Sequence, residues 1–300
     1  MSKTIAICNQ KGGVGKTTTA INLSAALALS GQRILLVDLD PQANTTGGLG
    51  IDKKGVTQSI YQLLLEDLPA TSAIVSTQIP NLELIPSQAA LSGAEIELVG
   101  LSQREGRLKK VVELVRPTYD LIFIDCPPSL GLLTVNALTA ADSVLVPLQC
   151  EYYALEGLSQ LLETIRLIQG GLNPALVLEG VLMTMADFRT KLTNDVIQEV
   201  RRYFGSKVYD LVIPRSVRLS EAPSRGLPIC LYDPDSAGAR SYHLLGERIK
   251  ENANVRDTGV RQRDPGPDPG GFVRASEGGS RTSTPPGDPA QPISAQEGSQ

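Results

Sequence analysis

The sequence predicts an α/β fold with a doubly wound, mainly parallel sheet flanked by helices. Short apolar runs alternate with longer segments of helical period along most of the 300 residues. Most of these runs are apolar on both faces, as strands are in a parallel sheet that is covered on both sides. A glycine-rich turn joins the first apolar run to the first helical segment, which is the strand–turn–helix order of such folds.

The first element is the apolar run Ile5–Cys8, followed by the turn Lys11–Thr17 and a helical pattern over residues 20–29. The turn reads Lys-Gly-Gly-Val-Gly-Lys-Thr. Its glycines let successive backbone N–H groups point inward at phosphate oxygens, and the helix adds the positive end of its dipole. In this setting Lys16 reaches the β- and γ-phosphates of a nucleotide, and the Thr17 hydroxyl ligates Mg²⁺. The context favours this phosphate loop over a plain glycine turn.

The loop departs from the common phosphate-loop pattern at two positions. Gln10 stands where that pattern has a glycine, and Lys11 adds a second lysine. This arrangement resembles the deviant Walker A motif of the ParA/MinD family of ATPases. In that family the first lysine reaches across a dimer interface to the nucleotide of the other subunit, so the resemblance implies an ATP-dependent homodimer; the spacing alone shows only a phosphate site with two cations. The resemblance also implies the nucleotide-binding residues Lys11, Gly12, Gly13, Val14, Gly15, Lys16, Thr17, Thr18, Pro214 and Ser216.

The second predicted strand, Arg33–Asp38, ends in the sequence Asp-Leu-Asp-Pro-Gln. Carboxylates at the carboxyl end of a strand beside a phosphate loop are well placed to orient water and Mg²⁺. Without the loop, a turn aspartate before proline would explain Asp40 as well. By the resemblance, Asp40 positions or activates the attacking water and Asp38 binds the Mg²⁺ hydration shell, and the Gly/Thr-rich segment 42–54 is a mobile loop near the nucleotide. The implied catalytic residues are Lys11, Lys16 and Asp40.

Residues 119–125 form another predicted strand, in which large apolar residues end in Asp125. This is the Walker B arrangement, whose carboxylate holds Mg²⁺ directly or through water. Many buried strands end in aspartate, so the pattern is informative only together with a phosphate loop. The Pro-Pro-Ser-Leu-Gly that follows can form a second nucleotide-sensing loop. The expected metal ligands are therefore Thr17, Asp38 and Asp125.

The other elements are less distinctive. Helical periods occur at residues 56–66 and 102–115, an edge strand is expected at residues 82–86, and segment 66–81 shows no clear pattern. Further apolar runs predict strands at residues 143–148, 176–184 and 208–213, and helical periods predict helices at 151–169 and 236–252. In the family the helix at 151–169 lies near the dimer interface, and an amphipathic scaffold helix is an equal alternative.

Pro214 and Ser216, which follow the last predicted strand, are candidates for contact with the nucleotide base. By the resemblance, Pro214 and Ser216 lie against the adenine ring. Many relatives have asparagine in place of Ser216, which is a departure from the family pattern. A turn followed by a helix cap explains Pro214 equally well from the sequence alone.

Composition separates the chain into two parts. Residues 1–256 are expected to form the P-loop ATPase domain. Residues 257–300 are expected to be a Pro/Gly-rich disordered tail, because 15 of the 43 residues from position 258 on are Pro or Gly and few are apolar. The tail lacks an amphipathic basic helix, and no apolar run approaches the ~18 residues of a membrane span. Strand residues from Thr4 on leave no room for a signal peptide, so we expect a cytoplasmic protein without a membrane partner.

The cysteines and the histidine point to no metal or redox centre. The four cysteines show no C-x-x-C spacing, and three lie in or beside predicted buried strands. This usage is typical of reduced core thiols in a cytosolic protein. The single histidine, His243, has no histidine partner for a metal or triad site. The cysteines are Cys8, Cys126, Cys150 and Cys230.

One region has the opposite charge to the rest of the chain. Residues 186–225 carry eight basic and five acidic side chains, a net charge of +3, so the remainder of a chain with net charge −4 carries −7. Such a region suits sequence-independent contact with phosphate backbones. From the charge alone, however, a helix face exposed to solvent is the better explanation of this region than a DNA-binding surface. By resemblance to chromosomal ParA proteins, Arg189 and Arg218 contact non-specific double-stranded DNA.

The resemblance covers residues 2–252 and implies a DNA-partitioning ATPase. ATP drives dimerisation, the dimer binds nucleoid DNA, and a ParB-type protein stimulates a weak intrinsic hydrolysis and releases the dimer. A ParA-like positioning ATPase for another cargo would have the same core, and the sequence does not separate the two. A MinD-like ATPase on a membrane would need the amphipathic helix that the tail lacks. A redox enzyme like the nitrogenase iron protein would need cysteines in a different context.

Overall fold

The computed structural model describes residues 2–151 and 156–257. In this part of the chain eight strands form one sheet in the order β3-β4-β2-β5-β1-β6-β7-β8. Neighbouring strands run parallel, except that β3 pairs antiparallel with β4. The predicted α/β class with a doubly wound, mainly parallel sheet is confirmed. The strands are β1 (Lys3–Ile7), β2 (Ile34–Asp38), β3 (Val75–Ser76), β4 (Leu82–Ile85), β5 (Leu121–Asp125), β6 (Ser143–Gln149), β7 (Val177–Ala186) and β8 (Val208–Pro214).

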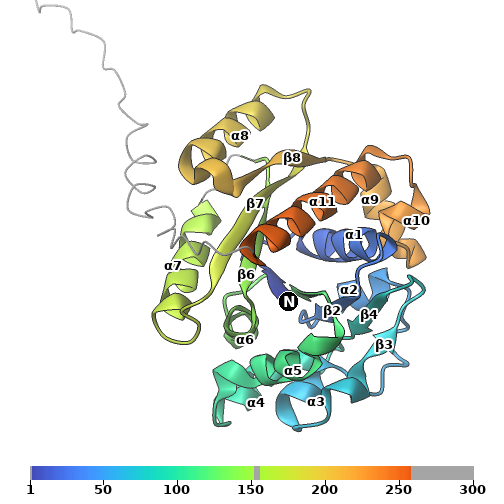
Figure 1. Ribbon diagram of the computed structural model, residues 1–300, viewed down its shortest axis with the longest axis vertical. Coiled ribbons are helices and arrows are strands. Elements are labelled where there is room, and N and C mark those ends of the chain that lie inside the picture. Colours follow the sequence, from blue (N-terminus) through green and yellow to red (C-terminus); the bar gives the residue numbers. More distant parts are fainter. Residues whose placement is uncertain (1, 152–155, 258–300) are drawn as a thin grey trace, which may run out of the picture. The chain divides into compact units, whose positions relative to one another are not determined.

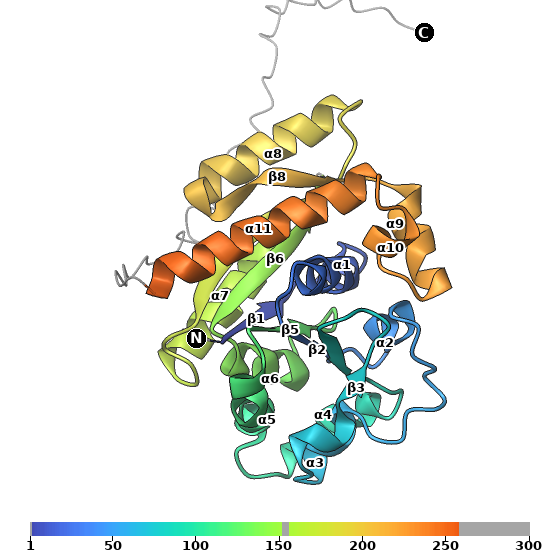
Figure 2. The same cartoon turned by 45° about the vertical axis from the view of Figure 1, so that its right-hand side comes forward.

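Helices cover both faces of this sheet (Figures 1 and 2). α1 and α11 lie side by side on one face, and α5 and α6 lie on the opposite face. None of the helices in the described residues is both long enough and apolar enough to cross a membrane. The helices are α1 (Lys16–Leu29), α2 (Asn44–Gly48), α3 (Ile60–Leu65), α4 (Leu91–Val99), α5 (Arg107–Val115), α6 (Leu132–Ala140), α7 (Glu156–Gly170), α8 (Lys191–Phe204), α9 (Val217–Glu221), α10 (Ile229–Tyr232) and α11 (Ala237–Asp257).

The connections place a topological switch point at β1. The chain leaves β1 for β2 on one side, whereas it leaves β5 and crosses β1 to reach β6 on the other side. Ligands of open parallel sheets bind beyond the carboxyl ends of the strands at such a point. The turn after β1 and the carboxylates that end β2 and β5 therefore share one crevice. The register agrees, because Asp125 pairs with Ile7 on one side and with Asp38 on the other.

The core holds the phosphate loop in place through the helix that follows it. All residues of β1, β2 and β5 are buried, as expected for central strands that read as apolar on both faces. Leu23 and Leu27 of α1 belong to the same buried cluster as Leu245 and Ile249 of α11. Each such side chain contributes ~1.5–3 kcal/mol when it leaves water. This packing fixes the axis of α1, and hence the direction of its amino end, relative to the sheet.

Two expectations about the middle of the chain were wrong, and one helix there was missed. The strand at 82–85 is not an edge strand, because the two-residue strand β3 covers it; β3 lies in the segment 66–81 and is too short to show a period. The segment 42–54 contains the helix α2 and is not a continuous loop. The helix α4 at residues 91–99 was not predicted.

Two predicted segments fall partly outside the described residues. The helix predicted at residues 151–169 is found as α7, which begins at Glu156, and residues 152–155 lie outside. The predicted tail, residues 257–300, lies outside except for Asp257, which ends α11. The prediction that the tail is disordered therefore stays a prediction.

Candidate functional site

The turn between β1 and α1 is curled by residues in the left-handed backbone region. Gly13 and Gly15 have φ angles of +74° and +90°, a conformation that glycine adopts without the Cβ clash of other residues. Gly15 precedes α1, and its carbonyl accepts the Thr19 N–H at 2.9 Å. From β7, the Thr184 hydroxyl donates to the Val14 carbonyl at 2.8 Å. The curl is therefore tied both to the helix and to the sheet, as a rigid phosphate cradle requires.

Lys16, the first residue of α1, lies inside this curl. Its side chain is buried, and Nζ donates to the Lys11 carbonyl at 3.2 Å. Burial lowers the pKa of Lys16, and the nearby charge of Asp125 opposes that effect. A buried ammonium whose hydrogen-bond acceptor is a neutral carbonyl is suited to bind a phosphate group.

Asp125, at the end of β5, is fully buried beside the same turn. Its Oδ2 accepts the Thr17 hydroxyl at 2.8 Å and the Thr45 hydroxyl at 2.7 Å. Burial raises the pKa of Asp125 to about 6, although both hydroxyls and the charge of Lys16 lower it. Within the described residues no donor reaches Oδ1.

A buried carboxylate oxygen without a donor, next to a threonine hydroxyl, fits a magnesium ion at this point. Among the described residues, no group of three or more His, Cys, Asp or Glu could hold a metal by itself. Magnesium commonly keeps water ligands and takes only one or two protein ligands beside substrate phosphates. Thr17 and Asp125 therefore fit a Mg²⁺ site that a bound nucleotide and water would complete.

Asp38 lies next to Asp125 in the sheet register, but its oxygens are already occupied. Oδ2 accepts the backbone N–H and the hydroxyl of Thr46 at 2.8 and 2.7 Å, and Oδ1 accepts the Asp40 N–H at 3.3 Å. Burial, followed by the charge of Asp125, raises the pKa of Asp38 to about 7. The visible role of Asp38 is to hold α2 against the strand ends, and its predicted contact with the Mg²⁺ hydration shell stays a prediction.

The other two predicted catalytic residues lie at the same end of the sheet. Asp40 is buried, its Oδ1 accepts the Gln42 N–H at 2.9 Å, and its charge acts on Lys16. The Lys11 side chain is 37% exposed, and Nζ lies 3.2 Å from Glu151 Oε2. The structure thus places one loop lysine inside the curl and leaves the other half-exposed.

Pro214 and Ser216 lie at the carboxyl end of the sheet, as the phosphate loop does. Pro214 ends β8, at the far edge of the sheet from β3, and the side chain of Ser216 makes no capping hydrogen bond to α9. The chain beyond them returns to α1, where the Ile229 N–H donates to Asn22 Oδ1 at 2.6 Å. The adenine contact of Pro214 and Ser216 therefore stays a prediction.

The two predicted DNA-binding arginines lie at the carboxyl ends of neighbouring strands. The Arg215 N–H donates to the Ala186 carbonyl at 3.0 Å and so joins the ends of β7 and β8. Arg189 is 87% exposed in its side chain and forms a bidentate pair with Asp187 at 2.7 and 2.6 Å. This pair lowers the pKa of Asp187 to about 2.

Arg218 is held in the same way, 3.2 Å from Glu221 and 3.5 Å from Asp233. Exposed ion pairs of this kind contribute little free energy, because water and salt screen them. Both guanidinium groups can therefore exchange their carboxylates for a phosphate at small cost.

Sequence reasoning missed several residues that build the site. Thr45 and Thr46 bind the two buried aspartates from a segment that was expected to be a mobile loop. Asn9 accepts the Lys11 N–H at 3.0 Å and donates to the Pro147 carbonyl at 2.8 Å. The one signal available was the Thr-Thr pair shortly after Asp-Leu-Asp-Pro-Gln. Its partner Asp125 lies 80 positions away, so only the fold reveals the contact.

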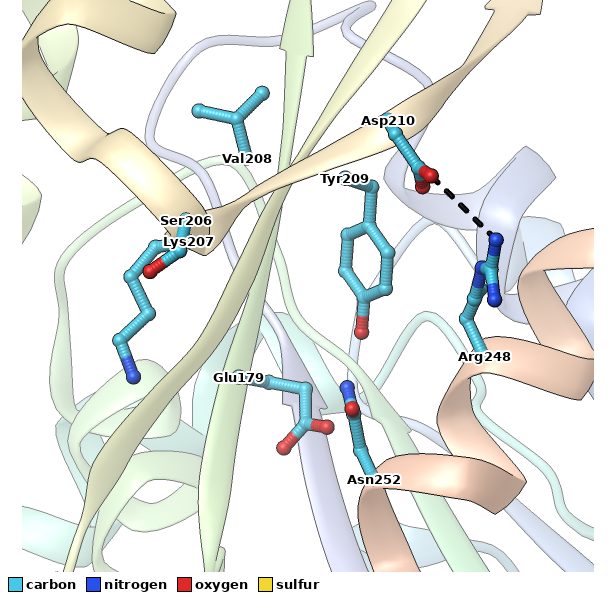
Figure 3. Close-up of a pocket in the computed structure, with 8 residues that line it drawn as sticks. All are labelled: Glu179, Ser206, Lys207, Val208, Tyr209, Asp210, Arg248 and Asn252. Carbon is cyan, nitrogen blue, oxygen red and sulfur yellow. Dashed lines mark hydrogen bonds and ion pairs between the residues drawn. The ribbon is translucent and has the colours of Figure 1, made fainter. Parts of the chain in front are cut away.

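A separate cavity of about 310 Å³ lies at the opposite end of the sheet, where β8 begins. Figure 3 shows Glu179, Tyr209 and Asn252 directed into it, with Arg248 bridging to Asp210 at 3.4 Å. Glu179 is also 2.7 Å from Lys3. None of the predicted site residues lines this cavity. This cavity therefore lies apart from the predicted nucleotide site.

A phosphate loop at the switch point of a parallel sheet, with a buried carboxylate beside its threonine, defines a P-loop nucleotide-binding protein. A family model described as an AAA domain matches residues 2–178. Over 252 residues the chain is 60% identical to the sporulation initiation inhibitor protein Soj of Bacillus subtilis, with 84% of this chain and 100% of that protein covered. Over 258 residues it is 54% identical to the chromosome partitioning protein ParA of Myxococcus xanthus, with 86% and 90% covered. The chain belongs to the ParA/Soj family of chromosome-partitioning ATPases.

The fold has relatives among solved structures as well. The cobyrinic acid a,c-diamide synthase from Mycobacterium smegmatis, with bound ATP analog and magnesium, superposes with a TM-score of 0.76 at 38% identity. This match covers 85% of the present chain and 96% of that protein. The family and the P-loop ATPase fold expected from the deviant loop are thereby confirmed.

Proposed function

We propose that this partitioning ATPase binds ATP and Mg²⁺ at the phosphate loop, forms a homodimer with ATP, and as a dimer binds double-stranded DNA without sequence preference. A ParB-type protein then stimulates its slow hydrolysis of ATP to ADP and phosphate and releases the dimer from the nucleoid. The relatives named Soj and ParA support the partitioning role. The proposal of a dimer rests on one observation, the half-exposed position of the Lys11 side chain.

Lys11 and Lys16 flank the same turn and have different environments. Lys16 is buried in the curl, whereas Lys11 is half-exposed and paired with Glu151, which follows β6. The loop from Asn9 to Thr19 contains no arginine that could supply a further cation. A half-exposed lysine beside the loop is free to act on the phosphates of a second subunit, where it supplies the charge that a trans arginine supplies in other NTPases.

The roles of the remaining residues belong to the same proposal. The curled backbone and Lys16 hold the β- and γ-phosphates, and Pro214 and Ser216 approach the adenine ring. Asp40 orients the attacking water and accepts its proton. Thr17 and Asp125 would hold Mg²⁺, with Asp38 behind them, and the bound ion would supply positive charge to the phosphates. Slow turnover of the isolated subunit follows, because the trans cation is absent until the dimer forms.

Replacing Lys11 with alanine tests the dimer. We expect the variant to bind ATP with nearly normal affinity and to hydrolyse it ~10³–10⁵-fold more slowly, since an arginine finger, which supplies a comparable trans cation in other NTPases, is worth ~10³–10⁵ in rate. Sedimentation in ADP and then in ATP, with and without DNA, measures the accompanying loss of the dimer. Lys54→Ala, at an exposed lysine outside the loop, is the matched control. Normal turnover by Lys11→Ala would remove the trans-lysine role.

DNA binding is assigned to Arg189 and Arg218 at the ends of β7 and β8. A dimer presents each arginine twice to one duplex, so weak single contacts add up. Because both arginines now pair with carboxylates, phosphates would replace Asp187 for one and Glu221 for the other. The region containing them has a net charge of +3 in a chain of net charge −4, which favours this face for the phosphate backbone.

The double variant Arg189→Glu with Arg218→Glu should lose retention on DNA at moderate salt. We expect the slope of log K against log salt to fall by roughly one unit for each phosphate that the protein no longer neutralises. Fluorescence anisotropy with a random-sequence duplex in ATP measures both quantities. Arg33→Glu with Arg248→Glu makes the same change of charge near the amino ends of the strands and should bind DNA almost normally. Equal retention by the two double variants would place the DNA on another face.

A further inference from the structure

Two cysteines lie directly beneath the phosphate loop and face each other. Cys8 follows β1 and Cys126 follows β5, and the register that pairs Ile7 with Asp125 makes them the next pair along the two strands. Their Sγ atoms are 2.8 Å apart, and each residue is only 1% exposed. The Cys8 thiol donates a hydrogen bond to Cys126 Sγ, so the two sulfurs are in direct contact.

The ends of β1 and β5 remain paired here, because the Cys126 N–H donates to the Ile7 carbonyl at 3.3 Å. Adjacent strands of a sheet lie ~4.8 Å apart, within the ~4.4–6.8 Å between Cα atoms that disulfides span. A disulfide bond is ~2.05 Å long, so the sulfurs would have to close by about 0.75 Å from their separation of 2.8 Å. The other two cysteines lie elsewhere, Cys150 after β6 and Cys230 in α10.

We propose that Cys8 and Cys126 are a reversible oxidation site, which a peroxide converts to a disulfide that slows ATP turnover. Formation of the disulfide depends only on the two thiols, whereas its effect on turnover rests on the proposed ATPase function.

The reaction balances with hydrogen peroxide as the oxidant. One sulfur gives an electron pair to a peroxide oxygen, the O–O bond breaks, and a sulfenic acid and one water form. The second sulfur then attacks the sulfenic sulfur, the S–S bond forms, and the oxygen leaves as a second water with the two remaining protons. Two thiols and one peroxide thus yield one disulfide and two waters, and a dithiol reductant reverses the step by thiol–disulfide exchange.

The position of the pair explains why turnover would change. Cys8 is followed by Asn9, whose side chain holds the start of the loop, and Cys126 follows Asp125, which binds the Thr17 hydroxyl. Both cysteines are thus next in the chain to residues that build the phosphate site. A misplacement of about 1 Å in a catalytic site can cost ~10²-fold in rate. A shift of comparable size beneath the loop is therefore expected to slow hydrolysis by ~10–100-fold.

The first test counts thiols in the full chain. After hydrogen peroxide, denaturation and alkylation, we expect two labelled cysteines where the untreated protein has four, with Cys8 and Cys126 joined in the peptide map. The variant Cys150→Ser with Cys230→Ser should still lose two thiols, while Cys8→Ser and Cys126→Ser should each form no internal disulfide. Four labelled cysteines after peroxide, or a disulfide that contains Cys150 or Cys230, would overturn the proposal.

The second test measures ATP hydrolysis by the same samples. Oxidised wild type should be ~10–100-fold slower and should recover with dithiothreitol, and Cys8→Ser should keep its rate after peroxide. If Cys8→Ser folds poorly, Cys126→Ser replaces it in this test, and its rate of ATP hydrolysis should also be unchanged by peroxide. A disulfide that leaves turnover unchanged would overturn the regulatory effect. If the reduced protein hydrolyses no ATP while its thiol count still falls from four to two, the proposed ATPase function fails and the oxidation site stands.

Discussion

Lys16→Ala is expected to abolish binding of ATP at micromolar concentrations. The ammonium is buried within the curled loop, and among residues 2–151 and 156–257 its one acceptor is the Lys11 carbonyl, so its charge is available to a phosphate. Hydrogen bonds to charged groups are worth ~1.5–3 kcal/mol each. Removal of two such hydrogen bonds corresponds to a fall in affinity of ~10²–10⁴-fold. Isothermal titration calorimetry with a non-hydrolysable ATP analogue and Mg²⁺ measures it directly.

The control for this variant separates loss of charge from loss of fold. Lys54→Ala removes an exposed lysine outside the loop and should bind the analogue as wild type does. Circular dichroism should show the same helix content for both variants. If Lys16→Ala binds the analogue with wild-type affinity, the nucleotide does not occupy the loop, and the assignment of the site is wrong.

Asp40→Ala is expected to bind ATP, dimerise and remain on DNA, because it can no longer complete hydrolysis. The buried carboxylate lies at the loop and close enough to Lys16 for its charge to act there. General-base residues contribute ~10²–10⁴-fold to rate, and we expect a loss of that size in single-turnover hydrolysis. Persistence of the DNA complex after a chase with excess ADP measures the trapped state.

A distant aspartate provides the comparison for Asp40. Asp235→Ala removes an exposed carboxylate in the turn before α11 and should hydrolyse ATP and leave DNA at the wild-type rate. A monomeric Asp40→Ala protein in saturating ATP and Mg²⁺ would contradict the ATP-dependent dimer. Wild-type hydrolysis by Asp40→Ala would instead show that another group orients the water.

Lys16→Ala and Asp40→Ala test a site that holds more buried charge than a stable core favours. Asp38 and Asp125 are adjacent and fully buried, and burial raises the pKa of each. Lys16 is the buried cation that faces Asp125, and burial lowers its pKa. Desolvated groups of this kind are costly without a ligand and cluster at functional sites for that reason. A divalent cation together with a triphosphate would supply the missing partners.

The local chemistry of the site was readable from the sequence. Gly13 and Gly15 permit the curl, Lys16 and Thr17 follow at the start of a helix, and Asp125 ends an apolar strand. Each of these signals lies within a few residues, where backbone geometry and hydrophobic period act directly. The parallel sheet followed from the same short-range patterns, and the structure confirms it.

The tertiary structure decided which distant residues meet. It forms the hydrogen bond between Thr45 and Asp125, the ion pair between Lys11 and Glu151, and the contact between Cys8 and Cys126. None of these contacts leaves a local period, because each depends on strand order and register. The short strand β3 was missed for a related reason, since two residues are too few to show alternation.

Local sequence patterns were thus enough to predict the phosphate loop, the aspartate-ended strands and the α/β class, because neighbouring residues specify turns, helices and strands through local sterics and apolar period. The folded structure was needed to show how the buried carboxylates are satisfied, which lysine lies inside the loop and which thiols touch. Those outcomes depend on the burial and pairing of groups that lie tens of residues apart, and no local pattern encodes them.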